Sequence, residues 1–243
     1  MKHAVIIAAG MGSRLAPFIH MPKPLLPVGG VPLLFRTLEG VEQAGCEEAI
    51  LVVGFRAEEI QAHVQAQYRG RLRLRIVYNP AYQKQNGLSV LAARPYVESP
   101  FLLLMADHCV EAAAIGRLRE WTPPEVGALL LVDSRLEQIA DMEDATKVLV
   151  HEGNVVDIGK QLPHYNAVDT GIFLATLSLM EAIAAVAQRW GDASLTDGVR
   201  ELARQGVMRA AEFGDYFWQD VDTLETYWIA ERWAQQYHAH HCL

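Results

Sequence analysis

The chain has 243 residues, of which 51% are hydrophobic, and it carries a formal net charge of −8. This length is sufficient for one large α/β domain with a substantial core, and we expect a single domain over residues 1–243. The negative charge argues against nucleic acids and anionic membranes as partners, because both attract basic protein surfaces.

The first half of the chain alternates strand-like and helix-like segments. Three apolar runs show no alternation and predict strands buried on both faces, at 4–7, 49–53 and 101–105. Helices are predicted over 31–44, 56–68 and 88–98. The alternation of leucine and isoleucine with arginine over 72–76 predicts a more exposed strand. This order indicates a mostly parallel sheet that binds ligands at the carboxyl ends of its strands.

The second half is more mixed. Strands are predicted at 127–132, 146–150, 155–158 and 170–175, and Gly153-Asn154 predicts a turn between the second and third of them. Helices are predicted at 177–189, 196–205 and 223–237. Together the two halves predict an α/β fold, a Rossmann-like, mostly parallel mixed sheet flanked by helices.

Cysteine content and targeting patterns suggest the compartment. Cys46, Cys109 and Cys242 show no metal-binding spacing and cannot all pair, so we expect free thiols in a reducing cytoplasm. The sequence shows neither an apolar run long enough to span a bilayer nor a secretory signal pattern. We therefore expect a cytoplasmic protein, monomeric or homodimeric, with a frayed polar tail over 238–243.

A glycine-rich segment follows the first predicted strand. Gly10 and Gly12 carry no side chains, so backbone N–H groups could closely approach a triphosphate, and Arg14 and Lys23 would add positive charge there. The spacing fits neither a dinucleotide-binding fingerprint, which needs a glycine where Leu15 stands, nor a P-loop. A tight turn without a ligand is the alternative, and the two added cations favour a phosphate site.

This segment resembles the G-x-G-x-R-L…P-K-P-L signature of the nucleotidyltransferases that make sugar nucleotides and related compounds. The identical positions are Gly10, Gly12, Arg14, Leu15, Pro22, Lys23, Pro24 and Leu25. The resemblance implies the nucleotidyltransferase fold, and it assigns catalytic roles to Arg14 and Lys23. The nucleotide-binding positions that it implies in this segment are Ala8, Ala9, Gly10, Gly12, Ser13, Arg14 and Lys23.

Acidic residues after two predicted strands are candidates for a metal site. Asp107 follows the strand at 101–105, where a carboxylate could hold Mg²⁺ or cap a helix over 110–119. For the adjacent His108 we expect a local hydrogen bond. Asp220 and Asp222 are two residues apart, so in a strand they share one face, although Asp222 could instead cap the next helix.

The resemblance to nucleotidyltransferases supports a metal site at these acids. The family carries an acid at the end of the corresponding strand, and Trp218-Gln219-Asp220-Val221-Asp222-Thr223 resembles the W-x-D-V-D-T segment of its cytidylyltransferase branch. The implied Mg²⁺ ligands are Asp107, Asp220 and Asp222. Which of Asp220 and Asp222 lies closer to the metal stays open.

Further matches suggest the groups that contact the base and the second substrate. Asn86-Gly87 is a hairpin signal, but a predicted helix follows it, so we expect a loop that lays backbone and amide groups against the base. This loop and the segments 168–173 and 196–202 resemble inositol-phosphate cytidylyltransferases. Asn86, Gly87, Ser89 and Asp107 thereby join the predicted nucleotide-binding residues. The predicted acceptor-binding residues are Lys147, Lys160, Asp169, Thr170 and Gly171.

These patterns predict an Mg²⁺-dependent cytidylyltransferase. It would transfer CMP from CTP to a phosphorylated alcohol and release pyrophosphate, with Arg14, Lys23, Asp107 and Lys160 as the catalytic residues. Resemblance alone favours myo-inositol 1-phosphate as the acceptor. The alternatives are phosphocholine, a phosphonate, or a hexose 1-phosphate used with UTP, dTTP or GTP. A non-catalytic subunit that binds a nucleotide is the rival from another class.

Overall fold

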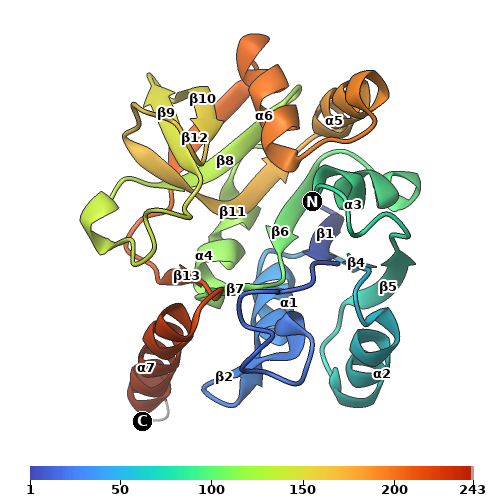
Figure 1. Ribbon diagram of the computed structural model, residues 1–243, viewed down its shortest axis with the longest axis vertical. Coiled ribbons are helices and arrows are strands. Elements are labelled where there is room, and N and C mark those ends of the chain that lie inside the picture. The colour runs from blue at the N-terminus through green and yellow to red at the C-terminus, as the bar shows by residue number, and fades with distance from the viewer. Residues whose placement is uncertain (242–243) are drawn as a thin grey trace.

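The computed structural model describes residues 1–241 and centres on one nine-stranded mixed sheet, in the order β5-β4-β1-β6-β11-β8-β12-β10-β9 (Figure 1). Its strands are β1 (His3–Ala8), β4 (Glu48–Val53), β5 (Arg73–Tyr78), β6 (Phe101–Met105), β8 (Ala128–Asp133), β9 (Lys147–His151), β10 (Asn154–Gly159), β11 (Ala167–Ala175) and β12 (Met208–Glu212). Strands from both halves of the chain therefore join one sheet.

Helices cover both faces of the sheet. They are α1 (Leu33–Gln43), α2 (Ala57–Gln67), α3 (Gly87–Ala92), α4 (Ala112–Gly116), α5 (Leu177–Trp190), α6 (Leu195–Arg204) and α7 (Leu224–His241). In β1, Val5 and Ile7 pack in one core with α3, α5 and α6, whereas Ala4 and Ile6 pack in a second core with α1, α2 and α4. Successive side chains of a strand point to opposite faces, so a continuous apolar run serves both cores.

The parallel part of the sheet is confined mainly to its first half. Strands β5, β4, β1 and β6 are parallel, as predicted, and β5 is the more exposed edge strand. Strands β6, β11 and β8 pair antiparallel, and so do β12, β10 and β9. The β9–β10 hairpin turns at Glu152 and Gly153, both with positive φ, which a short antiparallel connection requires.

Several predicted boundaries differ from the observed ones. The predicted helix over 88–98 ends at Ala92 and continues as a 3-10 turn over Arg94–Tyr96, because Pro95 cannot continue the α-helical hydrogen bonding. The short hairpin of β2 (Pro27–Val28) and β3 (Val31–Pro32) delays the start of α1. Asp107 does not cap a helix: β7 (His108–Val110) follows it, and α4 begins only at Ala112.

The C-terminal segment forms a separate small layer beside the sheet. Strand β13 (Trp218–Asp220) pairs with β7, and α7 packs against it through a stacked pair formed by Phe217 and Trp233, whose ring centroids are 4.4 Å apart. Helix α7 runs to His241, so the predicted frayed tail is helical over its first four residues. Residues Cys242 and Leu243 lie outside the described part.

Two further expectations concern thiols and membranes. Cys46 and Cys109 are buried free thiols, as predicted. Within the described residues, no helix combines the length and the apolar character needed to cross a bilayer.

Candidate active site

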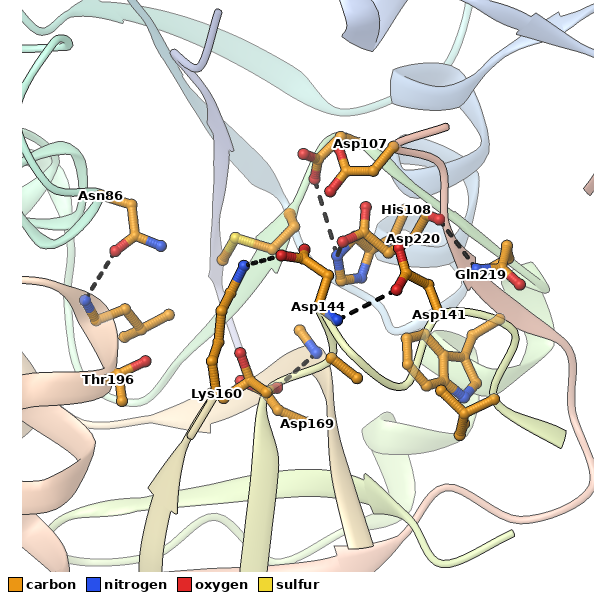
Figure 2. A pocket seen from close by; sticks show the side chains of 18 of the residues that line it. Asn86, Asp107, His108, Asp141, Asp144, Lys160, Asp169, Thr196, Gln219 and Asp220 are labelled. Atoms are coloured by element: carbon orange, nitrogen blue, oxygen red, sulfur yellow. Dashed lines mark hydrogen bonds and ion pairs between the residues drawn. The ribbon is translucent and has the colours of Figure 1, made fainter. Parts of the chain in front are cut away.

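A cavity of about 220 Å³ opens at the carboxyl-end edge of the parallel strands (Figure 2). Segments from the whole length of the chain line it, among them Arg14, Asn86, Asp107, Asp144, Lys160, Asp169, Trp218 and Asp220. A second hollow, of about 30 Å³, lies between Gly10, Gly12, Lys23 and Asp107. Because Asp107 lines both, the glycine loop and the predicted metal ligands belong to one region.

Lys23 is a buried cation among three carboxylates. It begins the 3-10 turn Lys23–Leu25, and only 5% of its surface is exposed. Its Nζ lies 2.9 Å from Asp107 Oδ2 and 3.5 Å from Asp220 Oδ1, and it also contacts Asp222 Oδ1. The three predicted metal ligands therefore converge on one point, although they come from segments more than a hundred residues apart.

Gly12 determines how Lys23 reaches this position. Its φ is +59°, and a Cβ at this residue would lie 3.1 Å from the Cβ of Lys23. Both the backbone conformation and the available space favour glycine here. Gly10, in contrast, has open space around its Cα, and Ser13 is exposed.

The charges in this cluster shift one another's titration. Burial alone would lower the pKa of Lys23, but Asp107, Asp220 and Asp222 together raise it, so Lys23 stays protonated. Burial would raise the pKa of Asp107, yet the charges of Lys23 and His108 hold it at about 2. Burial raises the pKa of Asp220 to about 6, despite the opposing effect of His108 and Lys23.

The donor set in this cluster fits a hard divalent cation. Three carboxylates surround a point that a lysine ammonium group already occupies, and Mg²⁺ prefers oxygen ligands from a few carboxylates and substrate phosphates. Ligand atoms of Asp107, His108 and Asp220 lie within 4.8 Å of one another, and so do those of Asp144, Asp220 and Asp222. Asp107, Asp220 and Asp222 are oxygen donors that could hold Mg²⁺, and Asp220 belongs to both groups.

His108 lies beside the acids and makes the local hydrogen bond that we expected. Its Nδ1 lies 2.9 Å from the backbone oxygen of Thr170. A carbonyl can only accept, so Nδ1 carries the proton, and Nε2 lies 3.9 Å from Asp107 and 3.8 Å from Asp220. Burial lowers the pKa of His108, but the two acids outweigh this effect and raise it.

Two more cations, Arg14 and Lys160, line the cavity and share Asp144 as a partner. Arg14 contacts Asp222 and lies 2.8 Å from Asp144, and Lys160, just after β10, lies 2.6 Å from the same Asp144. Asp144 was not predicted as a site residue. Its one signal in the sequence is the acidic run Asp141-Met142-Glu143-Asp144 between two strands, which equally describes a solvated loop.

The predicted acceptor residues divide into two groups. Lys160, Asp169 and Gly171 line the cavity. Lys147 is buried and donates to the backbone oxygen of Glu143 at 3.0 Å, and buried Thr170 donates to the backbone oxygen of Leu131 at 2.7 Å. The structure therefore does not bring these two side chains into the cavity: both are engaged with backbone oxygens behind its wall.

Asp169 and Gly171 form a small turn within β11. The Oδ1 of Asp169 accepts a hydrogen bond from the backbone N–H of Gly171 at 2.7 Å. Burial raises the pKa of Asp169 to about 6 against the effect of that hydrogen bond. Gly171 has a φ of +75°, and a Cβ there would lie 2.5 Å from Cε1 of His108, so only glycine fits.

The predicted base-binding loop is also only partly confirmed as cavity lining. Asn86 lines the cavity, and its Oδ1 accepts from the backbone N–H of Leu195 at 2.9 Å. Ser89 is buried and accepts from Asn79 at 2.9 Å. A Cβ on Gly87 would lie 2.5 Å from the backbone oxygen of Ala193, so close packing within the protein already requires glycine here.

The backbone at the end of β1 leads into the glycine-loop hollow, which Ala8 and Gly10 help to line. Ala8 and Ala9 are buried, and the backbone oxygen of Ala9 accepts from the N–H of Phe55 at 3.1 Å. That oxygen is therefore partly engaged, whereas the backbone of Gly10 is open.

Comparison with known proteins identifies the family. A family model described as "MobA-like NTP transferase domain" matches residues 4–202. The chain is 37% identical over 233 residues to a "Bifunctional IPC transferase and DIPP synthase" of Rubrobacter xylanophilus, covering 94% of this chain and 51% of that protein. It is 30% identical over 230 residues to a glucose-1-phosphate thymidylyltransferase of Streptomyces griseus, covering 91% of this chain and 62% of that protein.

A solved structure supports the same conclusion. The inositol-1-phosphate CTP transferase from T. maritima matches with a TM-score of 0.79 and 27% identity, over 96% of each chain. The chain spans about half the length of the bifunctional relatives that it matches. The fold, the arrangement of the glycine loop and these matches show that the chain belongs to the MobA-like NTP transferase family of nucleotidyltransferases.

Proposed function

We propose that the protein transfers CMP from CTP to a phosphorylated alcohol, with myo-inositol 1-phosphate as the preferred acceptor. One observation carries the proposal: Arg14 and Lys160 line one cavity, and Lys23 lies in the adjoining glycine-loop hollow that shares Asp107 with it. Such a site can bind two phosphorylated substrates at once. The inositol-1-phosphate CTP transferase from T. maritima supports the choice of substrates.

The proposed reaction is an in-line displacement. A phosphate oxygen of the acceptor attacks the α-phosphorus of CTP, a new P–O bond forms, and the bond between the α-phosphorus and the bridging oxygen breaks. Pyrophosphate leaves with the electron pair, so no protein nucleophile takes part. The phosphate monoester is already ionised at neutral pH and needs no general base. Positioning and charge neutralisation supply the catalysis.

The side chains of the cavity suit this division of tasks. Arg14 and Lys23 would bind the triphosphate and neutralise the pyrophosphate as it leaves. Lys160 would hold the acceptor phosphate, and the carboxylate of Asp169 could accept a hydrogen bond from an acceptor hydroxyl. Mg²⁺, held by Asp107, Asp220 and Asp222, would polarise the α-phosphate.

Base selection is proposed to rest on short-range hydrogen bonds. Cytosine presents an exocyclic amine donor where uracil presents an acceptor, and the wrong base leaves a buried polar group unpaired. Backbone groups of Ala8 to Gly10 and the Asn86 side chain are the candidates for this contact. Asn86 is oriented for it, because Leu195 fixes its Oδ1 and the amide lies at the cavity wall.

The proposal is tested by pyrophosphate release from a matrix of triphosphates and acceptors. CTP with myo-inositol 1-phosphate should give the highest kcat/KM, with UTP well behind and purine triphosphates poorest. The Streptomyces griseus relative makes dTTP with glucose 1-phosphate the second candidate pair. A preference for that pair would refute cytidylyl transfer but leave nucleotidyl transfer intact, and release with no pair would favour a non-catalytic nucleotide-binding subunit.

A further inference from the structure

One carboxylate joins the cations on the two sides of the cavity. Asp144 Oδ2 lies 2.8 Å from a terminal nitrogen of Arg14, and its Oδ1 lies 2.6 Å from Nζ of Lys160. Arg14 belongs to the glycine loop, and Lys160 follows β10. Figure 2 shows Asp144 between Lys160 and Asp141, joined to each by a dashed line. The cation proposed for the triphosphate and the cation proposed for the acceptor thus share one acidic partner.

The turn that carries Asp144 is held in place without any ligand. The backbone N–H of Asp144 donates to Asp141 Oδ1 at 3.2 Å, and that of Ala145 donates to the backbone oxygen of Asp141 at 3.0 Å. Buried Lys147 donates to the backbone oxygen of Glu143 from behind. These bonds preorganise the carboxylate, and they give Lys147 a positioning role in place of the predicted contact with the acceptor.

A substrate phosphate must compete with this carboxylate. Arginine and lysine make charge-assisted hydrogen bonds to carboxylates and phosphates alike, so a phosphate that binds Arg14 or Lys160 competes with Asp144 for the same donors. Within residues 1–241, Asp144 is the one acid that forms an ion pair with Lys160. Burial would raise the pKa of Asp144, but hydrogen bonds from Lys160 and Arg14 lower it, so the bridge is ionised at neutral pH.

We infer that Asp144 is an internal competitor of the substrate phosphates, which holds Arg14 and Lys160 in the free protein and is displaced when phosphates bind. The inference rests on the proposed role of these two cations as phosphate ligands. The bridge keeps both cations extended into the cavity and disfavours weakly charged anions, which cannot replace two ion pairs. Asp144 is therefore a positioning and specificity residue.

Calorimetric titration with inorganic pyrophosphate, in saturating Mg²⁺, tests this inference on the wild type and Asp144→Asn. The amide keeps the size of the side chain but removes its charge, so pyrophosphate should bind about fivefold more tightly. Glu143→Gln is the matched control, because it removes one charge from the same turn while the exposed Glu143 side chain takes no part in the bridge. Its affinity should stay within about twofold of wild type.

Every other result of the pyrophosphate titration leads to a different conclusion. Unchanged affinity in Asp144→Asn overturns the inference but leaves the phosphate site standing. Weaker binding also overturns it and would indicate that Asp144 helps to hold the metal with Asp220 and Asp222. Absence of binding in all proteins contradicts both the inference and the proposed function. Asp144→Ser, checked by its melting temperature, serves as a second variant in case the amide disturbs the turn.

Discussion

Lys23 is a buried ammonium group that occupies the centre of a carboxylate cluster. In the free protein it offsets the repulsion among Asp107, Asp220 and Asp222. A bound nucleotide with Mg²⁺ would change this balance, since the metal could take over the carboxylates and release Lys23 toward the phosphates. The same side chain would then serve two electrostatic purposes at successive stages of the reaction.

We expect Lys23 and Lys160 to affect different kinetic constants. Charge develops on the leaving pyrophosphate in the transition state, so Lys23→Ala should mainly reduce kcat. Lys160→Ala should mainly raise the KM of the acceptor, because its contact with the acceptor phosphate exists before the reaction. Steady-state kinetics with both substrates varied measures this, with Lys2→Ala, a distant exposed lysine, as the control. If both variants changed only the KM of CTP, the division of roles would be wrong.

We expect the buried carboxylate of Asp169 to lower the free energy of unfolding while it serves the proposed acceptor site. Its pKa rises from 3.8 in the unfolded chain to about 6 in the folded protein. Between these two pH values the folded state keeps a proton that the unfolded state has lost. The Asp169 carboxyl group therefore destabilises the folded protein increasingly as the pH rises from about 4 to 6. Above about pH 6 this destabilisation is complete.

The prediction is that Asp169→Asn raises the melting temperature at pH 8 and that this gain shrinks toward pH 4. The amide oxygen can still accept from Gly171, and the buried charge is gone. The same variant should raise the KM of a hydroxylated acceptor. Thermal unfolding across pH measures the effect, and a lower melting temperature of the variant at pH 8 would contradict it.

Strand β13 positions the acids through a tryptophan. Trp218 Nε1 donates to Asp133 Oδ2 at 2.8 Å, and Asp133, only 3% exposed at the end of β8, is also held by Arg135. Asp220 lies two residues along the same strand. The large sheet thereby fixes the small β7–β13 sheet in the orientation that directs Asp220 toward Lys23.

Trp218→Phe should lower both stability and kcat. The loss of a hydrogen bond to a charged group costs about 1.5–3 kcal/mol of stability. Without this bond β13 can move relative to the large sheet, and the resulting displacement of Asp220 should reduce kcat. Trp190→Phe is the matched control, since Trp190 is 75% exposed, and such a surface change alters stability by about 0.5 kcal/mol or less. Denaturant unfolding and steady-state kinetics measure both. Equal behaviour of the two variants would exclude a positioning role for Trp218.

The sheet as a unit brings the two proposed substrate sides together. Its parallel strands β1 and β6 lead to the glycine loop and Asp107, whereas Lys160 follows the end of β10 and Asp169 lies near the start of β11. Part of this arrangement could be predicted from the sequence. Carboxyl ends of parallel strands share one edge, so the meeting of Lys23 with Asp107 followed from strand order and the loop pattern.

Other details of the site differ from the predictions or were not predicted. Alternation along β11 already places Asp169 and Gly171 on one face and Thr170, which donates to Leu131, on the other, but the family resemblance grouped all three residues. Gly87 packs against Ala193, far along the chain, which no local pattern reveals. Asp144 lies in a loop whose partners exist only after both halves of the sheet have assembled.

The most direct test is pyrophosphate release from CTP and myo-inositol 1-phosphate by the wild type and Asp107→Asn, with Mg²⁺ and with EDTA. We predict that release by the wild type requires both substrates and Mg²⁺. Asp107→Asn should reduce kcat by about a thousandfold while the protein stays folded, because the amide removes one charged metal ligand. Undiminished release by Asp107→Asn, or by the wild type in EDTA, would contradict metal-assisted transfer at this cluster.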